Sequence, residues 1–143
     1  MRIEELSVGD WVRTADQDIR GSRECIIQSI ERWSNGDVLV VRFKDGGIET
    51  LGIGCFVPIL LTAEILERNG WLPPRAGLDF DTWWWTNKVD VAIEASEYQG
   101  EWQLTIIEQK EIQYNYRLGL GLKYVHELQH ALTLAKIDKD IVL

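Results

Sequence analysis

Residues that can cross-link a chain, bind a metal or interrupt a helix or strand are scarce among these 143 residues. Proline occurs three times, and cysteine and histidine twice each. So little proline, with 45% hydrophobic residues, excludes a composition typical of disorder. Cys25 and Cys55 allow at most one disulfide, and they are too far apart in sequence for a metal or redox pair. We interpret both as reduced, buried apolar side chains.

A long hydrophobic run is also missing. The longest, residues 56–61, is far too short to cross a bilayer. The first residues are charged and lack the apolar segment of a signal peptide. We therefore expect a cytoplasmic protein without a membrane partner.

Basic residues are outnumbered by acidic ones, 15 to 23, which gives a net charge of −8. Residues 1–60 carry seven basic and ten acidic residues, and residues 61–143 carry eight and thirteen, so neither half is basic. Binding to a nucleic-acid backbone depends on positive charge that displaces counterions. The charge balance therefore argues against a general nucleic-acid partner.

The first sixty residues are rich in short β-strand patterns. Strands are predicted near 8–12, 25–33, 37–43 and 48–53, with strong turn signals at Ser34-Asn35-Gly36 and Lys44-Asp45-Gly46-Gly47. The β-branched segment 37–43 (DVLVVRF) is typical of a strand that is buried on both faces or lies centrally in a sheet. Short strands joined by tight turns predict a small SH3-like barrel in residues 1–60.

The remainder, residues 61–143, alternates between helical and strand patterns. Thr62 is a suitable N-cap and Gly70 a suitable C′ residue for a helix between them. Strands are predicted at 80–86, 89–95, 102–108 and 112–116, and a closing helix at 122–136. Residues 118–121 (LGLG) are interpreted as a flexible loop entering that helix. The whole chain is predicted to be α+β, with a barrel-type module, a helix, an antiparallel meander of three or four strands and a C-terminal helix packed against it.

Three segments carry a resemblance to a known family. They are residues 6–12 (LSVGDWV), 56–71 (FVPILLTAEILERNGW) and 123–141 (KYVHELQHALTLAKIDKDI). In order and spacing they resemble a family of uncharacterised proteins of Bacteroidota genomes, prophages and other mobile elements. Asp10 stands where that family commonly has Asn. The resemblance implies a mobile-element setting and no particular chemistry.

The pentapeptide His126-Glu127-Leu128-Gln129-His130 matches the H-E-x-x-H signature of zinc peptidases. In those enzymes two histidines one helical turn apart bind zinc, and the glutamate activates a zinc-bound water. A third protein ligand is also needed, and the chain has no other histidine. Glu108 or Glu111 is the alternative ligand that the sequence leaves open. The family resemblance implies frequent Gln at position 127 and Asn at 130, which would abolish such a site.

A helical wheel places the two histidines opposite the apolar stripe of the closing helix. The stripe is formed by Tyr124, Val125, Leu128, Ala131, Leu132 and Ala135. We therefore predict that His126 and His130 face solvent, that no third ligand lies in reach, and that the motif is coincidental. The corresponding expectation is that the protein has no cofactor.

Three consecutive tryptophans, Trp83, Trp84 and Trp85, are the remaining binding candidates. As an aromatic platform they would bind a sugar, base or peptide. As core residues they would fill a small sheet from both sides, because alternate strand residues point to opposite faces. We favour the core, and exposure of two of the three would favour the platform.

Three functions follow from these patterns. The leading hypothesis is a non-enzymatic interaction or accessory protein whose partner is a protein or a second copy. The enzyme hypothesis is zinc-dependent peptide hydrolysis by His126, His130 and Glu127. The third is nucleic-acid binding through the predicted N-terminal barrel.

Overall fold

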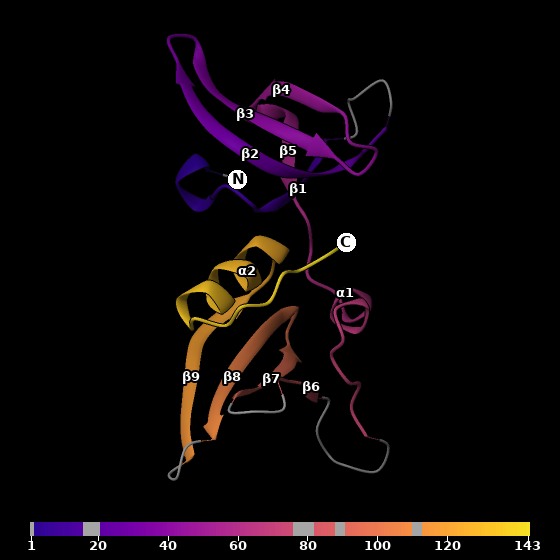
Figure 1. Cartoon of the computed structure of the whole chain (residues 1–143), viewed down its shortest axis with the longest axis vertical. Helices are drawn as coiled ribbons and strands as arrows, with labels where there is room; N and C mark the ends of the chain where they lie inside the picture. Colours follow the sequence, from indigo (N-terminus) through magenta and orange to yellow (C-terminus); the bar gives the residue numbers. More distant parts are fainter. Residues whose placement is uncertain (1, 16–20, 76–81, 88–90, 110–112) are drawn as a thin grey trace. The chain divides into compact units, whose positions relative to one another are not determined.

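A computed structural model describes residues 2–15, 21–75, 82–87, 91–109 and 113–143, with only the backbone described for 108, 109 and 113–120. The chain forms two compact units. Unit 1 comprises Met1–Leu60, Tyr124–His130 and Leu143, and unit 2 comprises Leu61–Lys123 and Ala131–Val142. The first turns of the last helix therefore belong to unit 1. Figure 1 shows the order of the elements along the chain.

The predicted fold class is wrong. The structure is mostly β, with 48% strand and 19% helix, and its described strands form two antiparallel sheets and no closed barrel. The described part of the chain contains two α-helices, and none is long and apolar enough to span a membrane. The turn signals were correct, but closure depends on pairing between the first and last strands, which turn residues do not specify.

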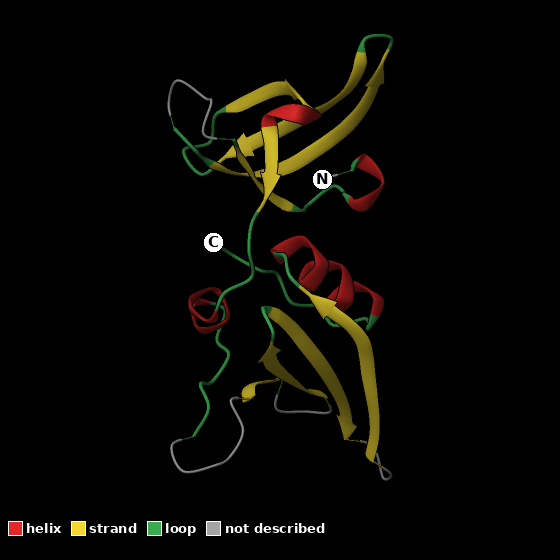
Figure 2. Ribbon diagram, turned by 180° about the vertical axis from the view of Figure 1, so that it is seen from behind, coloured by secondary structure: helices red, strands yellow, loops and turns green. Residues whose placement is uncertain are grey.

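Unit 1 is built on an open sheet with the strand order β4-β3-β2-β1-β5. Its elements are η1 (Ile3–Glu5), β1 (Trp11–Thr14), β2 (Glu24–Trp33), β3 (Gly36–Phe43), β4 (Ile48–Gly52), η2 (Ile53–Cys55) and β5 (Phe56–Pro58). The edge strands β4 and β5 are joined through η2, and no pairing is present between them. Figure 2 shows the same sheet from behind, with the β2–β3 hairpin continuing past its neighbours.

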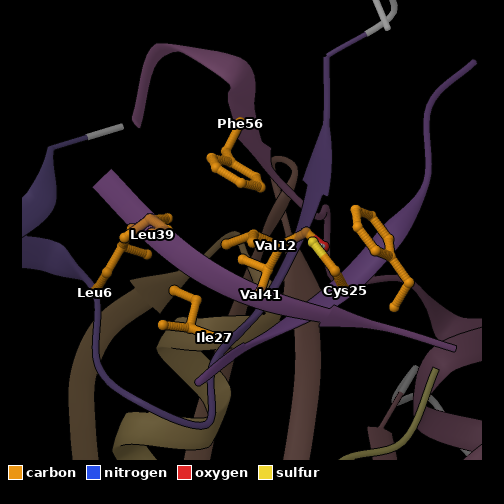
Figure 3. Close-up of a cluster of buried hydrophobic side chains, with 8 residues drawn as sticks. Leu6, Val12, Cys25, Ile27, Leu39, Val41 and Phe56 are labelled. Atoms are coloured by element: carbon orange, nitrogen blue, oxygen red, sulfur yellow. Dashed lines mark hydrogen bonds between the residues drawn. The ribbon is translucent and has the colours of Figure 1, made fainter. Parts of the chain in front are cut away.

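One face of this sheet carries the core of unit 1 (Figure 3). We call it the inner face. Its buried side chains, together with Leu6, are Val12, Cys25, Ile27, Leu39, Val41, Phe43 and Phe56. Cys25 is buried as predicted, and burial raises the pKa of its thiol to about 12. Cys55 is exposed, contrary to prediction, and neither cysteine forms a disulfide.

A β-bulge divides β2 into two parts. Ile27 pairs with Val41, but Ser29 pairs with Val40, so Gln28 is an extra residue. Beyond the bulge the inward positions shift by one, and Ile30 lies opposite the buried Leu39 on the inner face. Glu31 and Trp33 consequently point to the other face of the hairpin.

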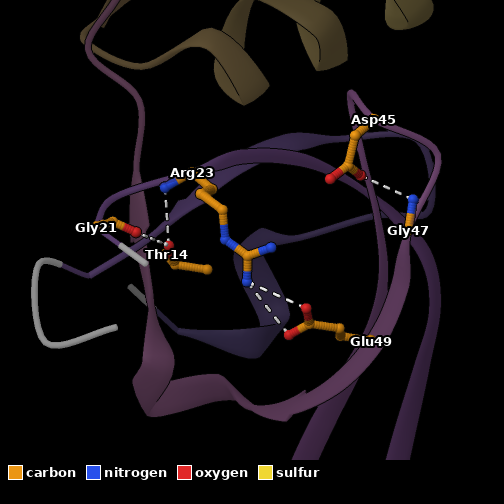
Figure 4. A network of polar contacts seen from close by, with 6 residues as sticks. All are labelled: Thr14, Gly21, Arg23, Asp45, Gly47 and Glu49. Atoms are coloured by element: carbon orange, nitrogen blue, oxygen red, sulfur yellow. Dashed lines mark hydrogen bonds and ion pairs between the residues drawn. The ribbon is translucent and has the colours of Figure 1, made fainter. Parts of the chain in front are cut away.

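A polar network closes one end of the core (Figure 4). The Arg23 guanidinium lies 3.8 Å from the centre of the Phe43 ring, and its Nη2 contacts both carboxylate oxygens of Glu49 at 3.2 and 3.3 Å. The backbone N–H of Arg23 donates to Thr14 Oγ1, whose hydroxyl donates to the Gly21 carbonyl. Together these contacts fix the backbone on both sides of residues 16–20.

Unit 2 contains a sheet with the order β6-β7-β8-β9. Its strands are β6 (Thr82–Thr86), β7 (Val91–Tyr98), β8 (Glu101–Gln109) and β9 (Gln113–Leu122). The four predicted strands are therefore present, although their predicted starts at Phe80, Val89 and Ile112 lie outside the described residues. The predicted loop 118–121 is wrong, because these residues continue β9 opposite β8.

The two helices begin and end near their predicted positions. In α1 (Ala63–Arg68) the backbone N–H of Ile65 donates to Thr62 Oγ1, and Gly70 follows with a φ of +79°. Both capping predictions are confirmed. The helix α2 (Val125–Leu134) is shorter than predicted at both ends. Its core positions Val125, Leu128 and Leu132 are buried as predicted.

The C-terminal segment of unit 2 is anchored by Asn69. The Asn69 amide donates to the carbonyl of Val142 and accepts from its backbone N–H, both at 2.8 Å. The same amide nitrogen donates to the Ile65 carbonyl at the end of α1. Lys139 Nζ also donates to the Asn69 carbonyl, at 2.6 Å. One buried side chain thus joins a helix end to the last residues of the chain.

We predict that Asn69→Ala lowers the free energy of unfolding by about 2 kcal/mol, because several buried polar groups lose their partner. The control is Gln103→Ala, which removes an exposed amide on β8 and should change stability by less than about 0.5 kcal/mol. Urea denaturation of both variants measures the effect. Equal stabilities would contradict the assigned role of Asn69.

Candidate functional site

The HELQH segment lies in the first turns of α2, and its residues make specific contacts within unit 1. Glu127 is the third residue of the helix, and its Oε2 accepts the backbone N–H of Tyr124 at 3.0 Å. This is the contact of a capping glutamate, which satisfies an N–H that the helix leaves unpaired. The carboxylate that would activate a zinc-bound water is therefore engaged in capping.

Gln129 fixes the start of β1. Its side-chain oxygen accepts the backbone N–H of Trp11, and its nitrogen donates to the carbonyl of Gly9, both at 3.0 Å. An amide that both accepts and donates on neighbouring backbone groups aligns the helix with the turn before β1. Gln129 thus holds the backbone of Gly9 and Trp11 next to α2.

His130 contacts Asp10 in the same turn. Its Nε2 lies 2.9 and 3.0 Å from the two carboxylate oxygens, and the side chain of Asp10 is only 3% exposed. Asp10 also accepts the backbone N–H of Ser7 at 2.7 Å. Burial raises the pKa of Asp10, and the Ser7 N–H and the two nearby histidines act in the opposite direction. This carboxylate contradicts the prediction that no acidic group lies in reach of the histidines.

His126 is 3% exposed, so the prediction that it faces solvent is wrong. Its ring stacks on that of Tyr124 with centres 5.7 Å apart and an angle of 8°. Its Nδ1 is buried without a hydrogen-bond partner in the described structure. Burial lowers the pKa of His126, so the neutral ring is favoured. The wheel located the apolar stripe correctly but could not show what covers the opposite side.

Asp10, His126 and His130 do not amount to a metal site. Among the residues described, no three His, Cys, Asp or Glu side chains are arranged to hold a metal ion. The alternative ligand Glu111 lies outside the described residues, as does the side chain of Glu108. Gln129 and His130 instead join α2 to β1 and to the turn before it, and Glu127 caps the start of α2. We call this arrangement the helix latch.

The tryptophan run lies on β6, at the edge of the unit 2 sheet. Trp84 is 42% exposed, whereas Trp83 and Trp85 are half-buried. Lys139 Nζ lies 5.0 Å from the centre of the Trp85 ring, a cation–π contact within the unit. The backbone of Trp84 pairs with Leu72 on its free side. Only one tryptophan of the three is exposed, which does not meet the criterion for a platform.

A surface that the sequence did not indicate lies on the other side of the unit 1 sheet, opposite the core. We call it the outer face. Cross-strand partners share a face, so the register assigns its members row by row. They are Trp11, Arg13, Glu24, Ile26, Ser29, Glu31, Trp33, Val38, Val40, Arg42, Ile48, Thr50 and Val57.

Seven of these thirteen side chains are apolar, and none of the thirteen is buried. Trp33 is 53% exposed and Ile48 is 64% exposed. Segment 37–43 is therefore not buried on both faces, because Val38 and Val40 are only half-buried. It does lie between two other strands of the sheet, which is the second arrangement that its sequence predicted. The solvent side of an antiparallel sheet is normally polar. An apolar outer face of this extent indicates a binding surface.

The two ends of the outer face carry different charged side chains. Arg13, Glu24, Arg42 and Lys44 lie at one end, where Lys44 contacts Glu24 and lies 6.0 Å from the centre of the Trp11 ring. Glu31 and Trp33 lie at the hairpin tip, and the Trp33 indole donates to Glu31 at 2.9 Å. The two cations and two carboxylates among the thirteen members cancel, and Lys44, directly after β3, adds one positive charge beside them on a chain of net charge −8.

Comparison with known proteins gives no identification. No protein-family model matches the chain, and neither a curated protein nor a solved structure matches it. The candidate site therefore rests on the geometry alone.

We expect the purified, untagged protein to retain less than about a tenth of a zinc ion per chain after incubation with zinc and desalting, since a catalytic site would hold its metal through this treatment. Metal analysis by plasma mass spectrometry measures the ratio. One zinc per chain, lost in both His126→Ala and His130→Ala, would overturn the interpretation of HELQH as a helix latch.

A second expectation follows from the buried His126. Because its pKa is lower when folded than the ordinary 6.5, the unfolded chain binds more protons near and below pH 6.5. Its contribution to stability is therefore complete above about pH 6.5 and declines as the pH falls, by at most about 1.4 kcal/mol per pH unit.

The measurement is urea denaturation from pH 7.5 to 5 for the wild type and His126→Phe, whose ring can still stack on Tyr124. The stability difference between the two should move in favour of the variant as the pH falls. The raised pKa of Asp10 has the opposite sign, since its contribution is lost as the pH rises. His126 is one of the groups that lower this pKa, so its removal moves the difference in the same direction, in favour of the variant at low pH. Parallel pH profiles would contradict the role of His126.

Proposed function

We propose that the protein is a non-enzymatic interaction protein that binds a protein partner through the outer face of the unit 1 sheet. The observation that supports this proposal most directly is that seven apolar side chains line this solvent-accessible sheet face, with Trp33 and Ile48 more than half exposed. Tryptophan and arginine are frequent among the side chains that supply most of the energy of protein binding, and the outer face carries two of each.

The charge pattern favours a protein over a nucleic acid. Arg13, Arg42 and Lys44 are accompanied by Glu24 and Glu31, so the positive excess on this face is a single charge. Nucleic-acid binding through the backbone requires several phosphate contacts by unopposed cations. The third hypothesis therefore receives little support from the outer face.

The helix latch supports the non-enzymatic part of the proposal. Of the groups that would perform hydrolysis, His130 instead pairs with Asp10 in the turn before β1, Glu127 caps α2, and His126 stacks on Tyr124. A mobile-element setting, which the family resemblance implies, is compatible with an accessory protein of this kind and forms the wider context of the proposal.

The test is co-purification from the native cells, with the tagged wild type compared with two variants. Ile48→Ser removes an apolar side chain from the outer face, and Leu134→Ser removes an exposed one from the end of α2. We expect a stoichiometric partner, either another protein or untagged copies of the chain, that Leu134→Ser retains and Ile48→Ser loses by about tenfold.

Two outcomes would reject the proposal. One is a monomeric chain with which no protein co-purifies. The other is a partner that Ile48→Ser retains at the wild-type level while circular dichroism shows both variants folded.

A further inference from the structure

The strand β4 forms one edge of the unit 1 sheet, and every second residue of it points its backbone groups away from the sheet (Figure 1). At the closed end of the β3–β4 hairpin the backbone N–H of Phe43 donates to the carbonyl of Gly47 at 2.8 Å. Bonded and non-bonded pairs alternate along an antiparallel ladder, so Glu49 and Leu51 also bond to β3. The outward-pointing groups therefore belong to the other three residues of β4, which are Ile48, Thr50 and Gly52.

These residues present an unpaired strand edge. Within the described part of the chain, no strand pairs with the outer side of β4. Ile48, Thr50 and Gly52 are all exposed, and Ile48 is 64% exposed. A row of unpaired N–H and C=O groups is the template on which another extended chain continues a sheet. The edge is therefore complementary to an extended peptide backbone.

The strand β4 lacks the features with which proteins protect a free edge. Its sequence, IETLG, contains no proline or lysine, and its register with β3 contains no bulge. Its one charged side chain, Glu49, points to the inner face, where an uncompensated charge would repel an incoming strand. Arg23 compensates this charge, because its Nη2 contacts both carboxylate oxygens.

The opposite edge of the sheet differs in both respects. Its strand, β5, is three residues long and ends at Pro58, which has no N–H to donate. Short strands and prolines are ordinary ways to prevent strand addition. Of the two edges of this sheet, β4 is therefore the one open to a further strand.

We propose that an extended segment of the protein partner adds to β4 as a further strand of the unit 1 sheet. This inference rests on the proposed function and specifies how the partner binds. The backbone of the segment pairs with Ile48, Thr50 and Gly52, so the segment has no proline at the positions that pair. It lies about 4.8 Å from β4 and widens the outer face by one strand.

The two faces of the sheet define the side chains that the segment carries. Its residues opposite Ile48 and Thr50 lie on the outer face, and the residue between them lies on the inner face beside Glu49. Ile48 provides an exposed apolar neighbour on the outer face, and Val40 follows in the next strand. The segment therefore has apolar side chains at alternate positions. An acidic residue opposite Glu49 is excluded, because like charges directly opposite each other are destabilising.

The charge of the chain favours a different protein over a second copy at this edge. Each copy carries a net charge of −8, so two copies repel each other as they approach. A neutral or basic segment forms the same backbone hydrogen bonds without this repulsion. The occupant is therefore an extended, proline-free segment of neutral or positive charge.

The probe is a library of random peptides displayed on phage and selected on the full chain. We expect the selected sequences to have apolar residues at alternate positions and no proline between them. A synthetic peptide of the selected sequence is then titrated against the wild type, Thr50→Pro and Thr50→Val. Thr50→Pro removes an outward N–H and keeps the ladder with β3, and it should raise the dissociation constant by about tenfold. Thr50→Val, the matched control, keeps the N–H and should bind as the wild type does.

Two further measurements do not depend on the folding of Thr50→Pro. On binding of the peptide to the wild type, amide exchange followed by NMR should slow most at Ile48, Thr50 and Gly52, and less at Glu49 and Leu51, which already bond to β3. N-methylation of the peptide at alternate nitrogens should abolish binding for one set and preserve it for the other, because only every second N–H of a strand faces its neighbour.

Several outcomes would overturn strand addition. One is a selection that enriches no peptide, and another is a peptide that binds folded Thr50→Pro as tightly as the wild type. Equal losses in Thr50→Pro and Thr50→Val would assign the effect to the side chain. Equal effects of both N-methylated sets would show that the peptide does not pair as a strand.

These failures are distinguishable from failure of the proposed function. If the co-purified partner is lost by Ile48→Ser but retained by Thr50→Pro, the outer face is the binding surface and only strand addition is wrong. If neither substitution affects a partner, both proposals fail.

Discussion

The buried carboxylate of Asp10 is the constraint on which the architecture of unit 1 depends. A carboxylate withdrawn from water is strongly unfavourable unless nearby donors satisfy its oxygens. Ser7 and His130 supply those donors, one from the preceding turn and one from the last helix, 120 residues away in sequence. Satisfying one side chain therefore fixes both the entry into β1 and the attachment of α2. Gln129 reinforces the same junction through the backbone of Gly9 and Trp11.

This constraint also explains why a catalytic signature can occur without the catalytic arrangement. Helix positions four residues apart share a face, so a pair of histidines at this spacing suits any surface that both must contact. In this chain one histidine stacks on Tyr124 and the other pairs with Asp10, while the glutamate between them caps the helix. The motif is thus consistent with local packing, and the sequence pattern alone does not distinguish the two uses.

Local signals in the sequence were sufficient for much of the secondary structure. The cap at Thr62, the turn glycine Gly70 and the inward positions Val125 and Leu128 follow from short-range chemistry. The open sheet and the burial of His126 did not follow, because both depend on contacts between segments far apart in the chain. Residues 118–121 were misassigned for the same reason: glycines disfavour a strand locally, but pairing with β8 maintains one.

The outer face was missed because alternation alone does not reveal which apolar side of a strand is covered. In segment 37–43 valines occupy both sides, so the pattern is equally typical of a strand between two layers. Only the register, and the burial that accompanies it, separates Leu39 and Val41 from Val38 and Val40.

The bulge at Gln28 has a consequence for how this surface could have arisen or been lost. Because strand side chains alternate, one extra residue exchanges the two faces of everything beyond it up to the turn unless a bulge accommodates it. The bulge accommodates Gln28, so deletion of Gln28 would leave Ser29 opposite Val40 and keep Glu31 and Trp33 on the outer face. If β2 instead continued through Gln28 without a bulge, the hairpin arm would present Arg32 where it now presents Glu31 and Trp33, while the core residues before position 28 stayed in place.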